Sequence, residues 1–167
     1  MGRKSDISAG LLVYRDRGTI EVLLAHPGGP YWARKDAGAW TIPKGLVEPG
    51  DDLLATAQRE FAEETGFVAH GPFIPLAPVR QKSGKTVHAF ATQGDFDPDH
   101  LVSNTFELMW PPKSGRLKSF PEVDRLGWFA PAQAHQKLLV YQHPLLLELT
   151  SMLAQRETPD PQARVKR

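Results

Sequence analysis

The segment from Pro49 to Gly66 limits the fold of this chain more than any other part of the sequence. Pro49-Gly50 is a turn sequence, Asp51 or Asp52 is a suitable N-cap, and Gly66 is a typical C-terminal stop. These signals predict one helix of about four turns, starting at Leu53. Because apolar residues recur at helical spacing, one stripe of this helix must pack against another layer. The stripe contains Leu54, Ala57 and Phe61.

Three glutamates crowd the end of this helix and lie beside its apolar stripe. Glu60 and Glu64 flank the stripe, and Glu63 follows on the same side. Like charges at this spacing destabilise a helix by roughly 0.2–0.5 kcal/mol, and carboxylates in the last turn oppose the helix dipole. A hard divalent cation would compensate them, since Mg²⁺ binds carboxylate oxygens, water and substrate phosphate. The alternative is a solvated helix end on which Arg59 makes surface ion pairs.

The remaining patterns predict an α/β domain. A turn at 15–18 separates two strand-like runs and predicts a hairpin, which a long loop follows. We expect the later strands to join the same sheet, and Pro131 and Pro144 suit the first turns of two helices. Strands are expected over 7–14, 20–25, 105–109 and 127–129, with two more on either side of a turn at 82–85.

Length and composition narrow the class of protein. A chain of 167 residues suits one domain, assigned here to residues 1–155, and residues 156–167 read as a disordered basic tail. The net charge of +1 argues against bulk binding of nucleic acid, so no stable nucleic-acid complex is expected. The chain has no cysteine and no apolar run long enough to cross a membrane, which favours a cytoplasmic protein without a membrane partner. The oligomeric state is left open.

The spacing of the loop and helix residues resembles the Nudix box. The sequence has Gly45, five residues, Asp51, seven residues, and then the run Arg59-Glu-Phe-x-Glu-Glu-x-Gly-Phe67. The family's pattern is Gly, five residues, Glu, seven residues, then Arg-Glu-apolar-x-Glu-Glu-x-Gly-apolar, and eight of its nine specified positions are filled. A chance match of this quality has a probability on the order of one in a million. The resemblance implies a Nudix-type α/β/α sandwich with a mixed β-sheet.

The resemblance also assigns roles to residues of the box. The metal-binding carboxylates of the family match Glu60, Glu63 and Glu64, and its backbone metal ligand matches the Gly45 carbonyl. Arg59 matches the arginine that orients a box carboxylate. The expected metal is Mg²⁺, for which Mn²⁺ can substitute.

Asp51 departs from the pattern because the family has glutamate there. The side chain keeps its charge, but the carboxylate is retracted by about 1.5 Å. Asp52 beside it is a possible substitute. Two interpretations follow: an active hydrolase, or a catalytically weak Nudix-fold module that binds nucleotides and regulates.

Several residues outside the box are candidates for binding the substrate. Lys44 precedes the box glycine and can contact a phosphate as a point charge. The loop at 31–35 combines aromatic and basic residues that can stack a base and hold phosphates, although an insertion without substrate contact would have the same composition. Many members of the family carry a further acid after the box, and Glu122 is the best match. The loop candidates are Tyr31, Trp32, Arg34 and Lys35.

The resemblance implies a metal-dependent pyrophosphohydrolase in which water attacks phosphorus. Glu60 is the first candidate for the general base, followed by Glu63 and Glu122. The substrate would be a small molecule with a nucleoside diphosphate linked to another group. Dinucleoside polyphosphates, nucleoside triphosphates, ADP-ribose-like molecules and inositol pyrophosphates all suit the box. The run Trp40-Thr-Ile-Pro-Lys-Gly45 is similar to that of dinucleoside polyphosphate hydrolases, whereas the lack of cysteine disfavours a Nudix isomerase.

Overall fold

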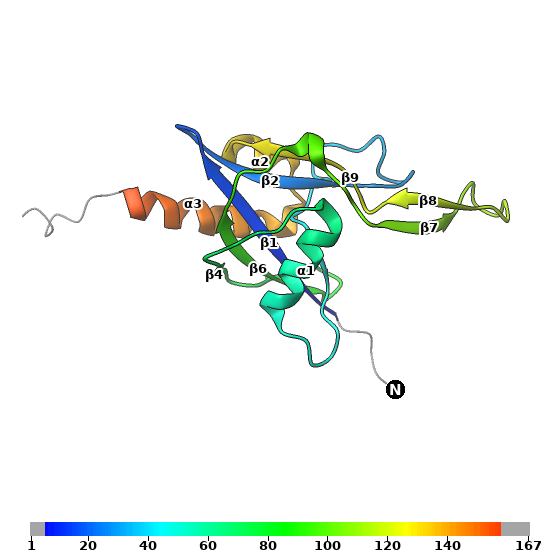
Figure 1. The fold of residues 1–167 in the computed structure, drawn as a ribbon, viewed down its shortest axis with the longest axis horizontal. Helices are drawn as coiled ribbons and strands as arrows, with labels where there is room; N and C mark the ends of the chain where they lie inside the picture. The colour runs from blue at the N-terminus through cyan, green and yellow to red at the C-terminus, as the bar shows by residue number, and fades with distance from the viewer. Residues whose placement is uncertain (1–5, 158–167) are drawn as a thin grey trace, which may run out of the picture.

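A mixed β-sheet lies between two helical layers in the computed structural model, which describes residues 6–157 (Figure 1). Helix α1 (Leu53–Thr65) covers one face of the sheet, and α2 (Pro131–Lys137) and α3 (His143–Glu157) cover the other. The expected α/β/α sandwich is therefore confirmed. The sheet contains β1 (Ile7–Asp16), β2 (Ile20–Pro27), β3 (Lys44–Leu46), β4 (Ile74–Pro75), β5 (Val79–Arg80), β6 (Thr86–Gln93) and β9 (Val123–Phe129).

Strand β1 is the centre of the sheet and supplies both cores. It pairs in parallel with β6, and antiparallel with β2 and, nearer its start, with β3. Alternate side chains of a strand point to opposite faces, so Leu11 packs toward α1 and Leu12 toward α2 and α3. Both side chains are fully buried. The position of β3 beside β1 brings the loop before the helix next to α1.

Helix α1 begins and ends where the sequence predicted. The Asp52 carboxylate accepts a hydrogen bond of 2.9 Å from the Ala55 N–H, which caps the first turn. Gly66 ends the helix in the left-handed region, with φ of 82°. Phe61 is fully buried and fixes the rotation of the helix against the sheet.

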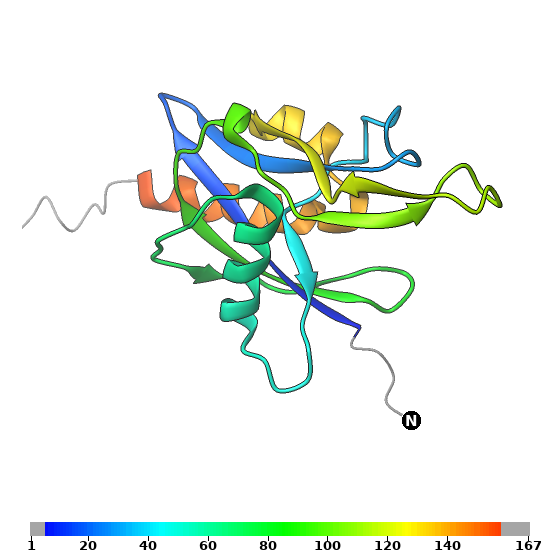
Figure 2. The ribbon, with the colours of Figure 1, turned by 45° about the vertical axis from the view of Figure 1, so that its right-hand side comes forward.

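A two-stranded hairpin of β7 (Thr105–Met109) and β8 (Leu117–Pro121) projects from the body of the protein (Figure 2). The expectation that residues 105–109 extend the main sheet was wrong, because β7 pairs with β8 instead. The sequence analysis also missed β8. Neither strand contributes a fully buried side chain: β7 alternates between exposed and partly buried residues, and β8 has one partly buried residue, Phe120.

Two further predictions concern the ends of the chain and membranes. Helix α3 continues to Glu157, two residues into the predicted tail, and residues 158–167 lie outside the described part. Within residues 6–157, no helix has the length and apolarity needed to span a membrane. Two short 3-10 helices complete the described elements, at Pro98–His100 (η1) and Val140–Gln142 (η2).

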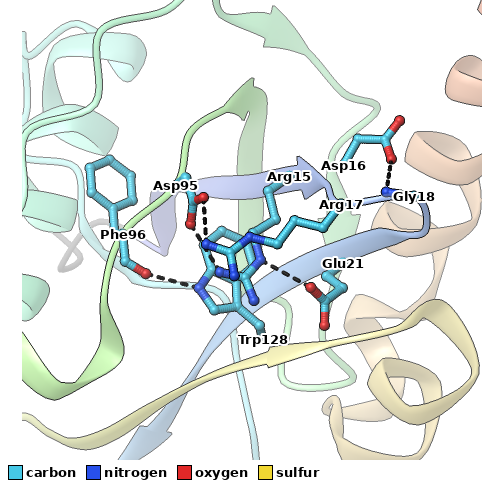
Figure 3. Close-up of polar contacts among 8 residues, drawn as sticks. All are labelled: Arg15, Asp16, Arg17, Gly18, Glu21, Asp95, Phe96 and Trp128. Atoms are coloured by element: carbon cyan, nitrogen blue, oxygen red, sulfur yellow. Dashed lines mark hydrogen bonds and ion pairs between the residues drawn. The ribbon is translucent and has the colours of Figure 1, made fainter.

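An ionic cluster joins the β1–β2 turn to the segment after β6 (Figure 3). Arg15 and Arg17 each donate a hydrogen bond of 2.9 Å to the Asp95 carboxylate. The Arg15 guanidinium also binds Glu21 at 3.0 Å and lies 4.2 Å from the centre of the Trp128 ring. The cluster therefore connects three parts of the chain at one end of the sheet.

Candidate active site

The carboxylates of α1 meet the β3 backbone at Lys44 and Gly45. The Glu60 carboxylate lies against Gly45 so closely that a Cβ at this position would overlap it. The Lys44 N–H donates a hydrogen bond of 3.1 Å to Glu64 Oε2. Strand β3 and the last turns of α1 thus hold two of the predicted carboxylates at one place.

Burial and mutual repulsion shift the titration of these groups. Burial, followed by the charge of Glu60, raises the pKa of Glu64 to about 8. Burial, followed by the charge of Glu63, also raises the pKa of Glu60. Burial lowers the pKa of the Lys44 ammonium, although Glu64 opposes this change. Without a further cation, the protein cannot easily keep all these carboxylates charged.

Arg59 connects two of the carboxylates. Its Nη1 atom lies 3.2 Å from Glu60 Oε1 and 3.3 Å from Glu63 Oε1. The structure therefore places Arg59 where the resemblance expected it, beside the box carboxylates. Half of this guanidinium side chain is exposed, so the contacts fix orientation more than they stabilise the fold.

Glu122 reaches the box through a series of backbone hydrogen bonds. The Asn104 N–H donates to the Glu63 carbonyl at the end of α1, at 2.8 Å. The Glu122 N–H donates to the Asn104 carbonyl at 2.7 Å, and the Gly28 N–H donates to the Glu122 carbonyl at 2.9 Å. Burial raises the pKa of Glu122. This residue, predicted from outside the box, is thus held beside the end of α1.

The carboxylates line a hollow of about 510 Å³, which we call the carboxylate hollow. It also contains Glu48, which the sequence analysis did not select, and it does not contain Asp51. The Asp51 N–H donates to the Glu48 carbonyl at 3.0 Å, so the two residues share one turn. The lining residues are Lys44, Gly45, Leu46, Glu48, Arg59, Glu60, Glu63, Glu64, Asn104, Thr105 and Glu122.

A second hollow of about 310 Å³ adjoins the first and shares Lys44, Glu64 and Glu122 with it. Trp32 and Tyr141 also line it, and we call it the Trp32 hollow. Trp32 was predicted from the sequence, whereas no local motif indicates Tyr141. The Tyr141 hydroxyl accepts a hydrogen bond of 2.9 Å from Gln142 Nε2 and burial raises its pKa.

Arg34 and Lys35 line a separate hollow with Trp40, Arg125 and Lys137. The Lys35 ammonium nevertheless lies 4.9 Å from the centre of the Trp32 ring. A buried histidine explains this placement: His26 Nε2 lies 2.6 Å from the Lys35 carbonyl oxygen, and its Nδ1 lies 2.7 Å from Asp124 Oδ1. These contacts fix the backbone of Lys35 against β9. Of the four loop candidates, the structure therefore brings only the two aromatic ones, Tyr31 and Trp32, to hollows that reach Glu122.

A family model described as the NUDIX domain matches residues 4–149, which is most of the chain. The chain belongs to the NUDIX family. Enzymes of this family generally use divalent metal cations. Within residues 6–157, no three acidic or histidine side chains are already grouped around one metal position.

The chain is also similar in sequence to individual NUDIX proteins. The asymmetrical bis(5'-nucleosyl)-tetraphosphatase of Rattus norvegicus is 41% identical over 110 residues, which cover 58% of this chain and 71% of the relative. The mitochondrial ADP-ribose pyrophosphatase of the same species is 58% identical over 69 residues, which cover 41% of this chain and 17% of the relative. In two other relatives the match covers 30% and 25% of their length. The chain therefore spans less than a third of the ADP-ribose pyrophosphatase and of these two relatives.

A solved structure shows the same fold over nearly its whole length. The Ap4A hydrolase of C. elegans, solved as a binary complex, superposes with a TM-score of 0.62 and 23% identity. The superposition covers 88% of this chain and 98% of that one.

Proposed function

We propose that this NUDIX protein is a metal-dependent pyrophosphohydrolase that cleaves a diphosphate bond in a nucleoside diphosphate-linked substrate. Water is the nucleophile and attacks phosphorus. The observation that carries the proposal is the carboxylate hollow, which combines Glu60, Glu63 and Glu64 with Lys44 and Glu122. A hollow that combines several carboxylates with a lysine suits phosphate chemistry, because such groups can bind metal and phosphate together.

The residues of the carboxylate hollow fit a divalent cation. Burial and mutual charge raise the pKa of Glu60 and Glu64, and a cation would offset both effects. The three glutamates and the Gly45 carbonyl would hold the metal, with Mg²⁺ as the expected ion and Mn²⁺ as a substitute. When bound, the metal would neutralise phosphate charge and lower the pKa of coordinated water.

The protein's own groups would position the substrate and move the proton. The Lys44 ammonium lies where it can contact a phosphate beside the carboxylates. Glu60 would accept the proton of the attacking water, with Glu63 and Glu122 as further candidates. Arg59 would keep Glu60 and Glu63 in orientation through its contacts of 3.2 and 3.3 Å.

Dinucleoside polyphosphates and nucleoside triphosphates are the substrates that we favour. The Trp32 hollow opens from the carboxylates and offers two aromatic side chains, which suits a nucleobase. A relative that is matched over 71% of its length is named as an asymmetrical bis(5'-nucleosyl)-tetraphosphatase, which is consistent with this choice. We retain the cytoplasmic location as a prediction.

A catalytically weak module that binds nucleotides and regulates is the second candidate. Its basis is Asp51, which replaces the glutamate of the box. Asp51 does not line the carboxylate hollow, whereas Glu48 from the same turn does. A glutamate from this turn is therefore still present in the hollow, which favours the hydrolase.

A substrate panel tests the proposal. The purified protein is incubated with dinucleoside polyphosphates, nucleoside triphosphates, ADP-ribose and an inositol pyrophosphate, with Mg²⁺, Mn²⁺ or EDTA, and products are separated by chromatography. We expect metal-dependent cleavage that Glu60→Gln abolishes. The control is Lys82→Ala, which should retain the cleavage because Lys82 is exposed and lines neither the carboxylate hollow nor the Trp32 hollow. Tight nucleotide binding without cleavage by the wild-type protein would support the regulatory module instead.

A further inference from the structure

Glu122 lies where three hollows meet. Besides the carboxylate hollow and the Trp32 hollow, it lines a third hollow of about 240 Å³. Tyr31 lines this third hollow, which we call the Tyr31 hollow, and Trp32 lines both it and the Trp32 hollow of about 310 Å³. Two spaces of similar volume, each with aromatic side chains, therefore open from one acidic centre.

Residues of the loop after β2 and of β7 line the Tyr31 hollow. The loop and the β7–β8 hairpin project on the same side of the protein (Figure 2). Gly28 holds the two parts together, because its Cα lies so close to the Pro121 carbonyl that a Cβ would overlap it. The Phe106 ring packs against Gly29. Farther out, the Tyr31 and Trp110 rings meet edge to face with centroids 5.3 Å apart. Aromatic groups thus line the hollow and continue along the hairpin.

One face of the hairpin combines these apolar groups with positive charge. Residues opposite each other in an antiparallel pair share a face, and the register places Lys118 opposite Leu108. Because Leu108 lines the Tyr31 hollow, Lys118 is on the same side of the hairpin. The next pair is Trp110 and Arg116, joined by a hydrogen bond of 2.9 Å between their backbones. The acidic residue of the hairpin, Glu107, is opposite Ser119 and therefore on the other face.

We propose that the Tyr31 hollow and this face of the hairpin bind a second nucleotide of the substrate, on the far side of the cleaved diphosphate. The inference rests on the proposed function and makes it more specific: the substrate is a dinucleoside polyphosphate. One nucleoside occupies the Trp32 hollow and the other contacts Tyr31 and Trp110. Lys118 and Arg116 bind the phosphates that lead to the second nucleoside, as exposed basic groups beside stacking aromatic side chains do in nucleotide sites.

The geometry favours two nucleosides over a longer nucleic acid. The Tyr31 hollow has room for one base, and the basic residues that the register places on this face of the hairpin are Arg116 and Lys118. The net charge of +1 argues against binding of oligonucleotides by bulk positive charge. A nucleoside triphosphate would occupy only one of the two aromatic hollows.

The test compares substrates that have and lack the second nucleoside. We measure kcat/KM for a dinucleoside tetraphosphate, a nucleoside triphosphate and a 5'-triphosphorylated oligonucleotide, with wild type, Trp110→Ala and the double variant Arg116→Ala/Lys118→Ala. We expect the variants to lose at least about ten-fold more kcat/KM on the dinucleoside tetraphosphate than on the triphosphate, since one stacked base contributes about 1–3 kcal/mol. Glu107→Gln, on the other face, is the matched control and should show no such selectivity.

Equal losses on the dinucleoside tetraphosphate and the triphosphate, or no loss on either, would overturn the inference. A selective loss on the oligonucleotide alone would also overturn it and would assign the hairpin to nucleic acid. Binding of a non-hydrolysable dinucleoside tetraphosphate, measured by calorimetry, separates this inference from the proposed function. Weaker binding by the hairpin variants would support the second-nucleotide site even if the wild-type protein hydrolysed nothing, whereas unchanged binding would contradict it.

Discussion

The Glu60 carboxylate occupies the space that a side chain at position 45 would need. Gly45 is in β3, which pairs with β1, whereas Glu60 is in α1 on the face of that sheet. The absence of a Cβ therefore lets a helix carboxylate contact the backbone of a strand. This contact places Glu60 beside the Gly45 carbonyl, the two groups that the proposal assigns to one metal ion.

Gly45→Ala should disrupt the contact between Glu60 and the β3 backbone without unfolding the protein. The added methyl group would displace the Glu60 carboxylate, and a displacement of about 1 Å can reduce turnover roughly 100-fold. We expect kcat to fall by about that factor, while circular dichroism and the melting temperature change little, because Gly45 is only partly buried. Wild-type turnover in Gly45→Ala would show that the position of Glu60 is unimportant.

Glu64→Gln should separate activity from stability. Its buried carboxylate has a pKa raised to about 8, so ionising it at higher pH destabilises the metal-free protein. The neutral amide removes this cost. In EDTA at pH 9, we therefore expect Glu64→Gln to melt at the same temperature as wild type or higher. Turnover with Mg²⁺ should fall by roughly 100-fold or more, because a metal ligand is lost. Lower stability at pH 9 in EDTA, compared with wild type, would contradict the account.

Asp95→Asn should lower stability in a pH-dependent way. Hydrogen bonds from Arg17 and Arg15 lower the pKa of Asp95 below its ordinary value of 3.8. The ionised carboxylate therefore stabilises the fold fully above about pH 4, and this contribution is lost as the pH falls through the lowered pKa. Urea unfolding should show a constant difference between wild type and variant from pH 5 to 7. Below pH 4 the difference should shrink, and a difference that grows there would refute the assignment.

Glu48 and Asp51 should differ in their effect on turnover. Glu48 lines the carboxylate hollow and Asp51 does not, although their backbones are joined in one turn. We expect Glu48→Gln to reduce kcat/KM by about ten-fold, as loss of a group near a metal does, and Asp51→Asn to reduce it less. Steady-state kinetics of the two variants decide the matter. A larger loss of kcat/KM in Asp51→Asn than in Glu48→Gln would show that Asp51, at the box position, is the more important of the two for turnover.

Local signals predicted the parts of the site that belong to one segment. The helix from Leu53 to Thr65 formed as expected because its N-cap, apolar spacing and Gly66 stop all lie within the segment. The box spacing likewise selected the glutamates, which the structure brings to one hollow. These features depend on neighbours along the chain, so the sequence contains the necessary information.

Features that depend on distant segments were missed or misplaced. Residues 105–109 were recognised as a strand, but their pairing with β8 depends on a second short segment with little apolar alternation. Tyr141 and Trp32 line the same hollow although they are far apart in the chain. Lys35 lines a hollow without the carboxylates because the buried His26 holds its backbone against β9, and its role in substrate binding stays a prediction. None of these contacts leaves a pattern in the surrounding sequence.

The most direct test of the central claim is hydrolysis of a dinucleoside tetraphosphate in ¹⁸O-labelled water, with mass spectrometry of the products. Reactions of wild type and Glu60→Gln are run with Mg²⁺ and with EDTA. The account predicts that wild type with Mg²⁺ releases nucleotide products with ¹⁸O in a phosphate group, and that EDTA or Glu60→Gln reduces this release by at least about 100-fold. Release at equal rates with Mg²⁺ and EDTA, or by wild type and Glu60→Gln alike, would contradict a metal-dependent attack by water at these carboxylates.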